Sequence, residues 1–189
     1  MDILDSTCRR QQGRSLKVKL FACAVLSSTI TNLSEYNNSS IAKASPKVTR
    51  NGTHKFGSYS NSRYAFFIEY PEDVFVGQGE SGSGDGQRFT AKNGAGEFSV
   101  WGELAMDFPK DTPLTCETAY KRVLGQTPGT TYKAKGKDWF VFSGYDDKGV
   151  FYKKVLFQDG QLKTLLVNYP RNRKTEFDPI VQRMAKSFR

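Results

Sequence analysis

The chain has 189 residues, of which 38% are hydrophobic and 13% aromatic, so it is long enough for one domain with a sizeable core. It has no run of about 18 or more apolar residues, which excludes a conventional membrane-spanning helix. The formal net charge of +9 is spread along the chain. It either favours acidic partners and anionic surfaces or is a basic composition without functional meaning.

The first part of the chain has the order of a secretory signal. Five basic residues lie within 9–19, an apolar segment follows at 20–30, and Ala42-Lys43-Ala44 offers a small-x-small cleavage site. We therefore expect residues 1–44 to be a signal peptide, cleaved after Ala44, and the mature protein to be periplasmic or secreted. A disordered tail and a plastid transit peptide are the alternatives.

The next segment, 45–62, is polar, contains proline and glycine, and shows no periodicity, so it is expected to be a flexible linker. A strand is expected from Arg63 to Tyr70, ending at Pro71 because proline cannot continue a ladder. Residues 77–86 are rich in glycine and are expected to form a mobile loop.

A hairpin is predicted from 88–92 and 97–102, because Asn93-Gly94-Ala95-Gly96 separates two strand-like runs. A helix is expected next, from Thr115 as N-cap to Leu124, with Gly125 as its stop signal.

Four strands follow, at 131–135, 138–144, 150–158 and 161–169. Asp159-Gly160 is the strongest turn signal in the chain, since a two-residue hairpin needs positive φ at both central positions. These strands should therefore pair as an antiparallel meander.

The last element is an amphipathic helix that is expected to start near Thr175 or Asp178, with Pro179 tolerated in its first turn. The face expected to pack on the sheet comprises Phe177, Ile180, Val181, Met184 and Phe188. The residues expected outside are Lys174, Arg183, Lys186 and Arg189. The pattern predicts an α+β fold, in which helices flank an antiparallel sheet of six to seven strands.

Three motifs in residues 63–189 carry a resemblance to a known family. They are Phe66-Phe67-Ile68-Glu69-Tyr70-Pro71, Trp139-Phe140-Val141-Phe142-Ser143-Gly144, and Tyr169-Pro170 followed by Asp178-Pro179-Ile180-Val181, Arg183 and Ser187-Phe188. This region resembles the PsbP-like superfamily, the α/β/α sandwich of the photosystem II subunit PsbP and the Ran-binding protein Mog. It is most similar to small exported bacterial members of unassigned role. The resemblance implies binding or assembly rather than catalysis, and implies no functional residues.

The sequence offers little material for catalysis, cofactor or metal binding. Residues 77–82 match G-x-G-x-x-G but lead into a strand, whereas a dinucleotide fingerprint opens a helix. Cys116 is the one cysteine outside residues 1–44, and His54, the single histidine, falls in the expected linker. The close carboxylate groups, Asp146-Asp147 and Asp107 with Asp111, suit turns better than a metal site. We expect no enzyme, no cofactor and no metal.

Basic residues are the remaining candidates for a site. Lys133 and Lys135 share a face of their strand by alternation. Together with Lys153, Lys154, Arg171 and Arg173 they are predicted to bind a partner, through one cationic patch. Alternatively, the lysines protect exposed strand edges from aggregation. Tyr132, Trp139 and Tyr152 interleave with the lysines as in nucleic-acid proteins, but an exported protein rarely meets nucleic acid.

These observations predict an exported, non-catalytic binding or assembly protein. Its partner is expected to be another protein, of acidic charge, or an anionic surface contacted peripherally without a membrane span. An immunity or inhibitor protein that neutralises an envelope-directed toxin or hydrolase is the alternative. A hydrolase is a distant third.

Overall fold

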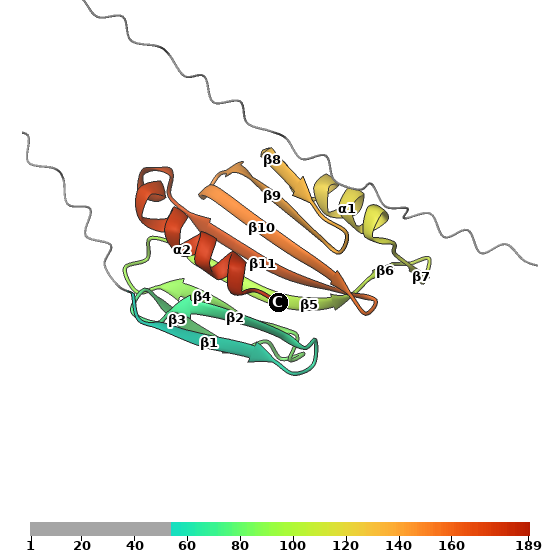
Figure 1. Ribbon diagram of the computed structural model, residues 1–189, viewed down its shortest axis with the longest axis horizontal. Coiled ribbons are helices and arrows are strands. Elements are labelled where there is room, and N and C mark those ends of the chain that lie inside the picture. The colour runs from blue at the N-terminus through green and yellow to red at the C-terminus, as the bar shows by residue number, and fades with distance from the viewer. Residues whose placement is uncertain (1–53) are drawn as a thin grey trace, which may run out of the picture. The chain divides into compact units, whose positions relative to one another are not determined.

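A seven-stranded antiparallel sheet forms the centre of the structure, a computed structural model that describes residues 54–189 (Figure 1). The order of its strands is β3-β4-β5-β11-β10-β9-β8. Their bounds are β3 Phe75–Glu80, β4 Gly86–Ala91, β5 Glu97–Leu104, β8 Thr130–Lys135, β9 Trp139–Asp146, β10 Gly149–Gln158 and β11 Gln161–Tyr169. The α+β class and the antiparallel sheet with flanking helices are thereby confirmed.

The meander β8 to β11 follows its expected order, and β11 then pairs with β5, which joins the two halves of the sheet. At the turn between β10 and β11, Asp159 and Gly160 have φ values of 53° and 69°. The prediction of a two-residue hairpin is therefore confirmed, because both central residues adopt the left-handed conformation.

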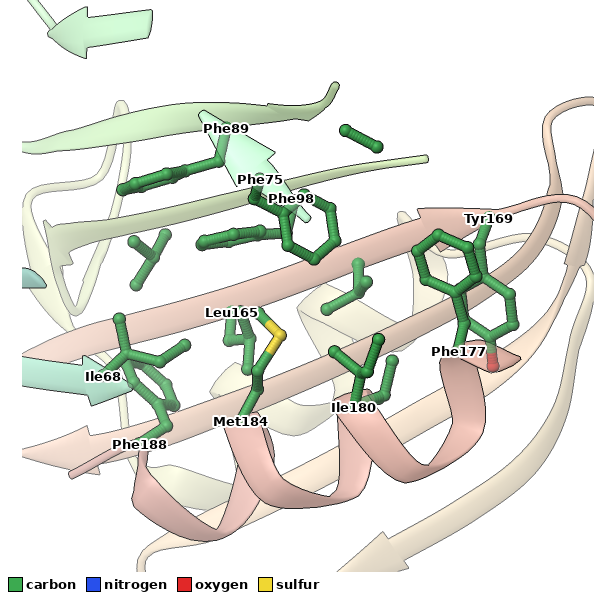
Figure 2. Close-up of a cluster of buried hydrophobic side chains, with 14 of the residues drawn as sticks. Ile68, Phe75, Phe89, Phe98, Leu165, Tyr169, Phe177, Ile180, Met184 and Phe188 are labelled. Carbon is green, nitrogen blue, oxygen red and sulfur yellow. The ribbon is translucent and has the colours of Figure 1, made fainter. Parts of the chain in front are cut away.

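One face of the sheet is covered by helix α2, Lys174–Ser187, and by a hairpin of β1, Phe56–Asn61, with β2, Phe66–Pro71. Figure 2 shows Ile180 and Met184 of α2 pointing toward the sheet. All five residues of the expected apolar face are buried. The rings of Phe89 and Phe98 stack at 4.3 Å between centroids, and those of Tyr169 and Phe177 at 5.2 Å.

The other face carries helix α1, Cys116–Gly125, which packs on β9 and on buried side chains of β10 and β11. Thr115 is its N-cap, as expected, and exchanges hydrogen bonds with Thr118 in a capping box. Two short strands, β6 Met106–Asp107 and β7 Thr112–Pro113, precede it, and a 3-10 turn, Arg171–Arg173, precedes α2. Strands β3 to β5 form the half of the sheet away from β9, on which α1 packs, and they carry partly exposed side chains on this face.

Two expectations about the N-terminal half are wrong. The glycine-rich segment is not a loop throughout, since β3 extends to Glu80 and pairs with β4 through an irregular register. The expected linker 45–62 contains β1, whose Tyr59 packs against the core. Both strands lie at an edge and contain glycine, so their sequences lack a clear apolar alternation. The predicted signal peptide and residues 45–53 lie outside the described residues.

Candidate functional site

The two candidates for nucleophilic chemistry lie on different sides of the sheet. His54 precedes β1 and contacts Asp73 at 2.8 Å between Nδ1 and Oδ2, on the side of the β1–β2 hairpin. Cys116 is the first residue of α1, on the opposite side. They therefore cannot act as a nucleophile and its base, which must be within hydrogen-bond distance. Within residues 54–189, no three acidic, histidine or cysteine side chains are grouped for a metal ion.

Three of the six basic residues predicted to bind a partner lie on the α1 side. Lys133 and Lys135 pair in register with Phe142 and Phe140, whose side chains pack in the cluster under α1. Lys135 Nζ contacts Glu117 Oε2 of α1 at 2.9 Å, which raises the pKa of Lys135. Lys153 Nζ donates a hydrogen bond to Thr127 Oγ1 at 3.0 Å, and burial lowers its pKa.

The other three lie on the α2 side. Lys154 Nζ donates hydrogen bonds to the backbone oxygens of Ala185 and Phe188 at 2.6 and 3.2 Å, and so caps the end of α2. Burial lowers the pKa of Lys154. Arg171 lies over the ring of Tyr145, and Arg173 forms an ion pair with Glu176 at 2.6 Å.

The expectation of a single cationic patch is therefore wrong. Successive residues of a strand point to opposite faces of a sheet, so Lys153 and Lys154 cannot share a surface. Lys133 and Lys135 do share a face, as alternation predicted.

The structure instead groups three tyrosines on the α2 side of β8, β9 and β10. Tyr132 and Tyr152 both pair in register with Ser143, one from each neighbouring strand, and Tyr145 lies two residues further along β9. All three side chains therefore surround the small Ser143 on one face. We call Tyr132, Tyr145 and Tyr152, with Arg171, the tyrosine shelf.

The shelf is accessible because α2 packs on β10 and β11 and leaves β8 and β9 uncovered on its side (Figure 1). Tyr132 is 58% exposed and Tyr145 is 41% exposed. Tyr152 is partly buried, and this burial raises its pKa to about 12. The guanidinium carbon of Arg171 lies 4.4 Å from the ring centroid of Tyr145, a cation–π contact that orders an exposed arginine.

The sequence alone had indicated Tyr132, Tyr152 and Arg171 but not Tyr145. A signal for Tyr145 was present in the loop at Asp146 to Gly149. The register of that hairpin places Tyr145 opposite Val150, and therefore on the same face as Tyr152.

Neither a protein-family model nor a curated protein matches the sequence. Among solved structures, the chain is similar to the solution structure of cyanobacterial PsbP (CyanoP) from Synechocystis sp. PCC 6803. The TM-score is 0.50 at 15% sequence identity, over 74% of this chain and 95% of that chain. The PsbP-like fold expected from the sequence motifs is thus confirmed. Within residues 54–189, neither helix is long and apolar enough to cross a bilayer.

Proposed function

We propose that this protein is an exported, non-catalytic binding or assembly protein that docks an acidic segment of a partner protein on the tyrosine shelf. The observation that carries the proposal is the presence of two exposed tyrosines, Tyr132 and Tyr145, on one face of the sheet, with an ordered arginine over the ring of Tyr145. Residues that dominate protein interfaces are enriched in tyrosine and arginine. Exposed aromatic side chains grouped in this way favour a docking surface over a merely solvated face.

The chemistry of the shelf suits a carboxylate-bearing partner. Tyrosine offers a large rigid contact area at low conformational cost, and its hydroxyl group provides a hydrogen bond at the rim. Arg171 carries five N–H donors in a planar fork that matches the geometry of a carboxylate. Because Tyr145 already holds the guanidinium in place, less side-chain entropy is lost when the partner binds.

Export and the absence of catalysis are further parts of the proposal. The order of charges and apolar residues in 1–44 supports export. The separation of His54 from Cys116 supports a role without covalent chemistry. The PsbP-like fold is compatible with both.

Site-specific photo-crosslinking in the native host tests the proposal. A photoreactive phenylalanine analogue at Tyr132 should give one discrete adduct with an acidic protein. The same analogue at Gln182, which is exposed on α2, should give none. Arg171→Glu in the Tyr132 variant should abolish the adduct.

Equal adducts from both positions, or an adduct that persists with Arg171→Glu, would contradict the proposal. If the captured partner is an envelope-directed toxin or hydrolase, the protein is an immunity or inhibitor protein that neutralises this partner. Arg171→Lys keeps the charge but not the planar fork, so it should retain only part of the crosslinking.

A further inference from the structure

The face of the sheet opposite α2 is uncovered at β4 and β5. Alternation and register place Arg88 of β4 beside Ser99 of β5, Thr90 beside Glu97, and Gly86 beside Trp101, all on this face. Helix α1 packs further along the sheet, on β9. We call this surface, formed by the outward side chains of β4 and β5, the open face.

Two hollows lie on the open face, and Arg88 lines both of them. The first, of about 250 Å³, lies between Lys148, Glu97 and the turn at Gly94 to Gly96. The second, of about 270 Å³, lies against Trp101, Ser99 and Asp85. The two hollows are therefore neighbouring halves of one elongated site.

The lining of the first hollow carries two cations, Arg88 and Lys148, and one carboxylate, Glu97. Asp147, which also attracts Lys148, lies outside this lining. Glu97 accepts hydrogen bonds from both Arg88 and Lys148, the latter at 2.7 Å between Nζ and Oε1. One carboxylate thus balances one of two cations. The side chains of Arg88 and Lys148 are each 60% exposed, so their remaining N–H groups are accessible to a second carboxylate from a ligand.

The second hollow combines a flat aromatic side chain with hydrogen-bonding groups. Trp101 is partly exposed, and Gly86, its neighbour in register, has no side chain that could cover it. Asp85 and Ser99 line the same hollow.

Asp85 accepts hydrogen bonds from Ser81 and Ser83, which hold its pKa below its usual value. Arg63 also lies near it. Like other aspartates, Asp85 is therefore ionised at neutral pH.

We propose that the open face binds an acidic oligosaccharide, with a sugar ring on Trp101 in the second hollow and a uronic-acid carboxylate at Arg88 and Lys148 in the first. Trp101 and Glu97 are four residues apart on one strand, which corresponds to about 13 Å. This spacing requires a ligand of more than one ring. The apolar face of a sugar ring packs on an indole, and its hydroxyl groups donate to Asp85.

The arrangement of charges favours a saccharide over an acidic peptide. Asp85 would repel the carboxylates of an acidic peptide, whereas it attracts hydroxyl donors. The backbone N–H and C=O groups of a peptide are best satisfied by an exposed strand edge, and β4 and β5 are inside the sheet. Cations at one end and an acceptor at the other match a ligand with one carboxylated ring and one hydroxyl-rich ring.

Isothermal titration of the full chain with cellotriouronic acid, which has one glucuronic acid ring and two neutral glucose rings, and with neutral cellotriose for comparison, tests the inference. The acidic trisaccharide should bind at least ten-fold more tightly than the neutral one. Trp101→Ala should weaken both at least ten-fold, while Trp101→Phe should restore part of the binding. Arg88→Gln should remove the preference for the acid without affecting cellotriose.

Two controls separate this site from others. Lys92→Gln, an exposed lysine at the end of β4, should leave both affinities unchanged. Tyr132→Ala should also leave both saccharide affinities unchanged. A negative result for saccharide binding on the open face is therefore distinguishable from a negative result for protein docking on the tyrosine shelf. Absence of cellotriouronate binding at millimolar concentration, or binding that survives both Trp101→Ala and Arg88→Gln, would overturn the inference. Tighter binding of a tri-glutamate peptide than of the saccharide would also overturn it.

Discussion

Lys153 and Lys154 are neighbours in the sequence, but their ammonium groups lie on opposite faces of the central sheet. Lys153 Nζ contacts Thr127 Oγ1 after α1, at 3.0 Å, and Lys154 Nζ contacts the backbone oxygen of Ala185 in α2, at 2.6 Å. This one pair links the sheet to elements on both sides. It also explains why a basic run in the sequence does not become a basic patch on the surface.

Lys154→Met should destabilise the protein by about 1 kcal/mol at pH 7, because the last carbonyl groups of α2 lose their charged donor. Lys186→Met, at an exposed position of the same helix, should change the free energy of unfolding by less than about 0.5 kcal/mol. Urea unfolding of the full chain measures both. Equal losses in the two variants would contradict a capping role for Lys154.

The difference in unfolding free energy between the wild type and Lys154→Met should also increase with pH. Burial lowers the pKa of Lys154 in the folded state below its ordinary value of 10.5. The unfolded chain then binds more protons between the two pKa values, so the wild type gains stability relative to Lys154→Met as the pH rises toward 10.5. The difference in unfolding free energy should therefore be larger at pH 10 than at pH 8. A difference that shrinks over this range would contradict the assignment.

Glu97→Gln should destabilise the protein by about 1 kcal/mol at pH 7, since Glu97 is the shared carboxylate of Arg88 and Lys148. The hydrogen bond from Lys148 lowers the folded pKa of Glu97 below 4.5. The stabilisation is thus present above pH 4.5 and is lost as the pH falls through the folded pKa. Chemical unfolding at pH 7 and pH 3 should show the difference between wild type and variant disappearing in acid. Glu72→Gln, which removes an exposed pair with Lys55, is the matched control.

Tyr152→Phe should make the protein more resistant to alkali. Burial raises the folded pKa of Tyr152 to about 12 from a reference value of 10.0. The stabilisation that follows from this shift is complete below pH 10 and is lost as the pH rises toward 12. The unfolding free energy of the wild type should fall more steeply than that of Tyr152→Phe over this interval. Parallel curves would show that Tyr152 ionises as freely in the folded protein as in the unfolded chain.

Phe177→Ala should cost about 3–5 kcal/mol, because it leaves a cavity beneath α2 next to the rings of Tyr169 and Phe75. Phe108→Ala removes the same atoms from a side chain that is 65% exposed, and should cost less than about 0.5 kcal/mol. Thermal and urea unfolding report both values. Comparable losses at the two positions would contradict the assignment of Phe177 to the core.

Much of the fold could be predicted from local signals. The bounds of β11 were as expected, and those of β10 differed by one residue, because Asp159-Gly160 specifies both the turn and the register around it. The face of α2 followed from its apolar spacing. Strands β1 and β3 were missed, since each is a short edge element whose stability comes from pairing rather than from its own pattern.

The candidate sites were less predictable for a related reason. The sequence by itself determined which residues of each strand share a face, because side chains alternate along an extended backbone. Only the tertiary structure decided which of those faces meets solvent, because exposure depends on where α1 and α2 pack across the sheet. Tyr132 and Tyr145 are exposed because α2 packs on β10 and β11, and Lys154 is partly buried because its ammonium group lies against the end of α2. The open face of β4 and β5 likewise exists because α1 packs on β9 and reaches β5 at the far end of that strand, where Arg122 pairs with Glu103.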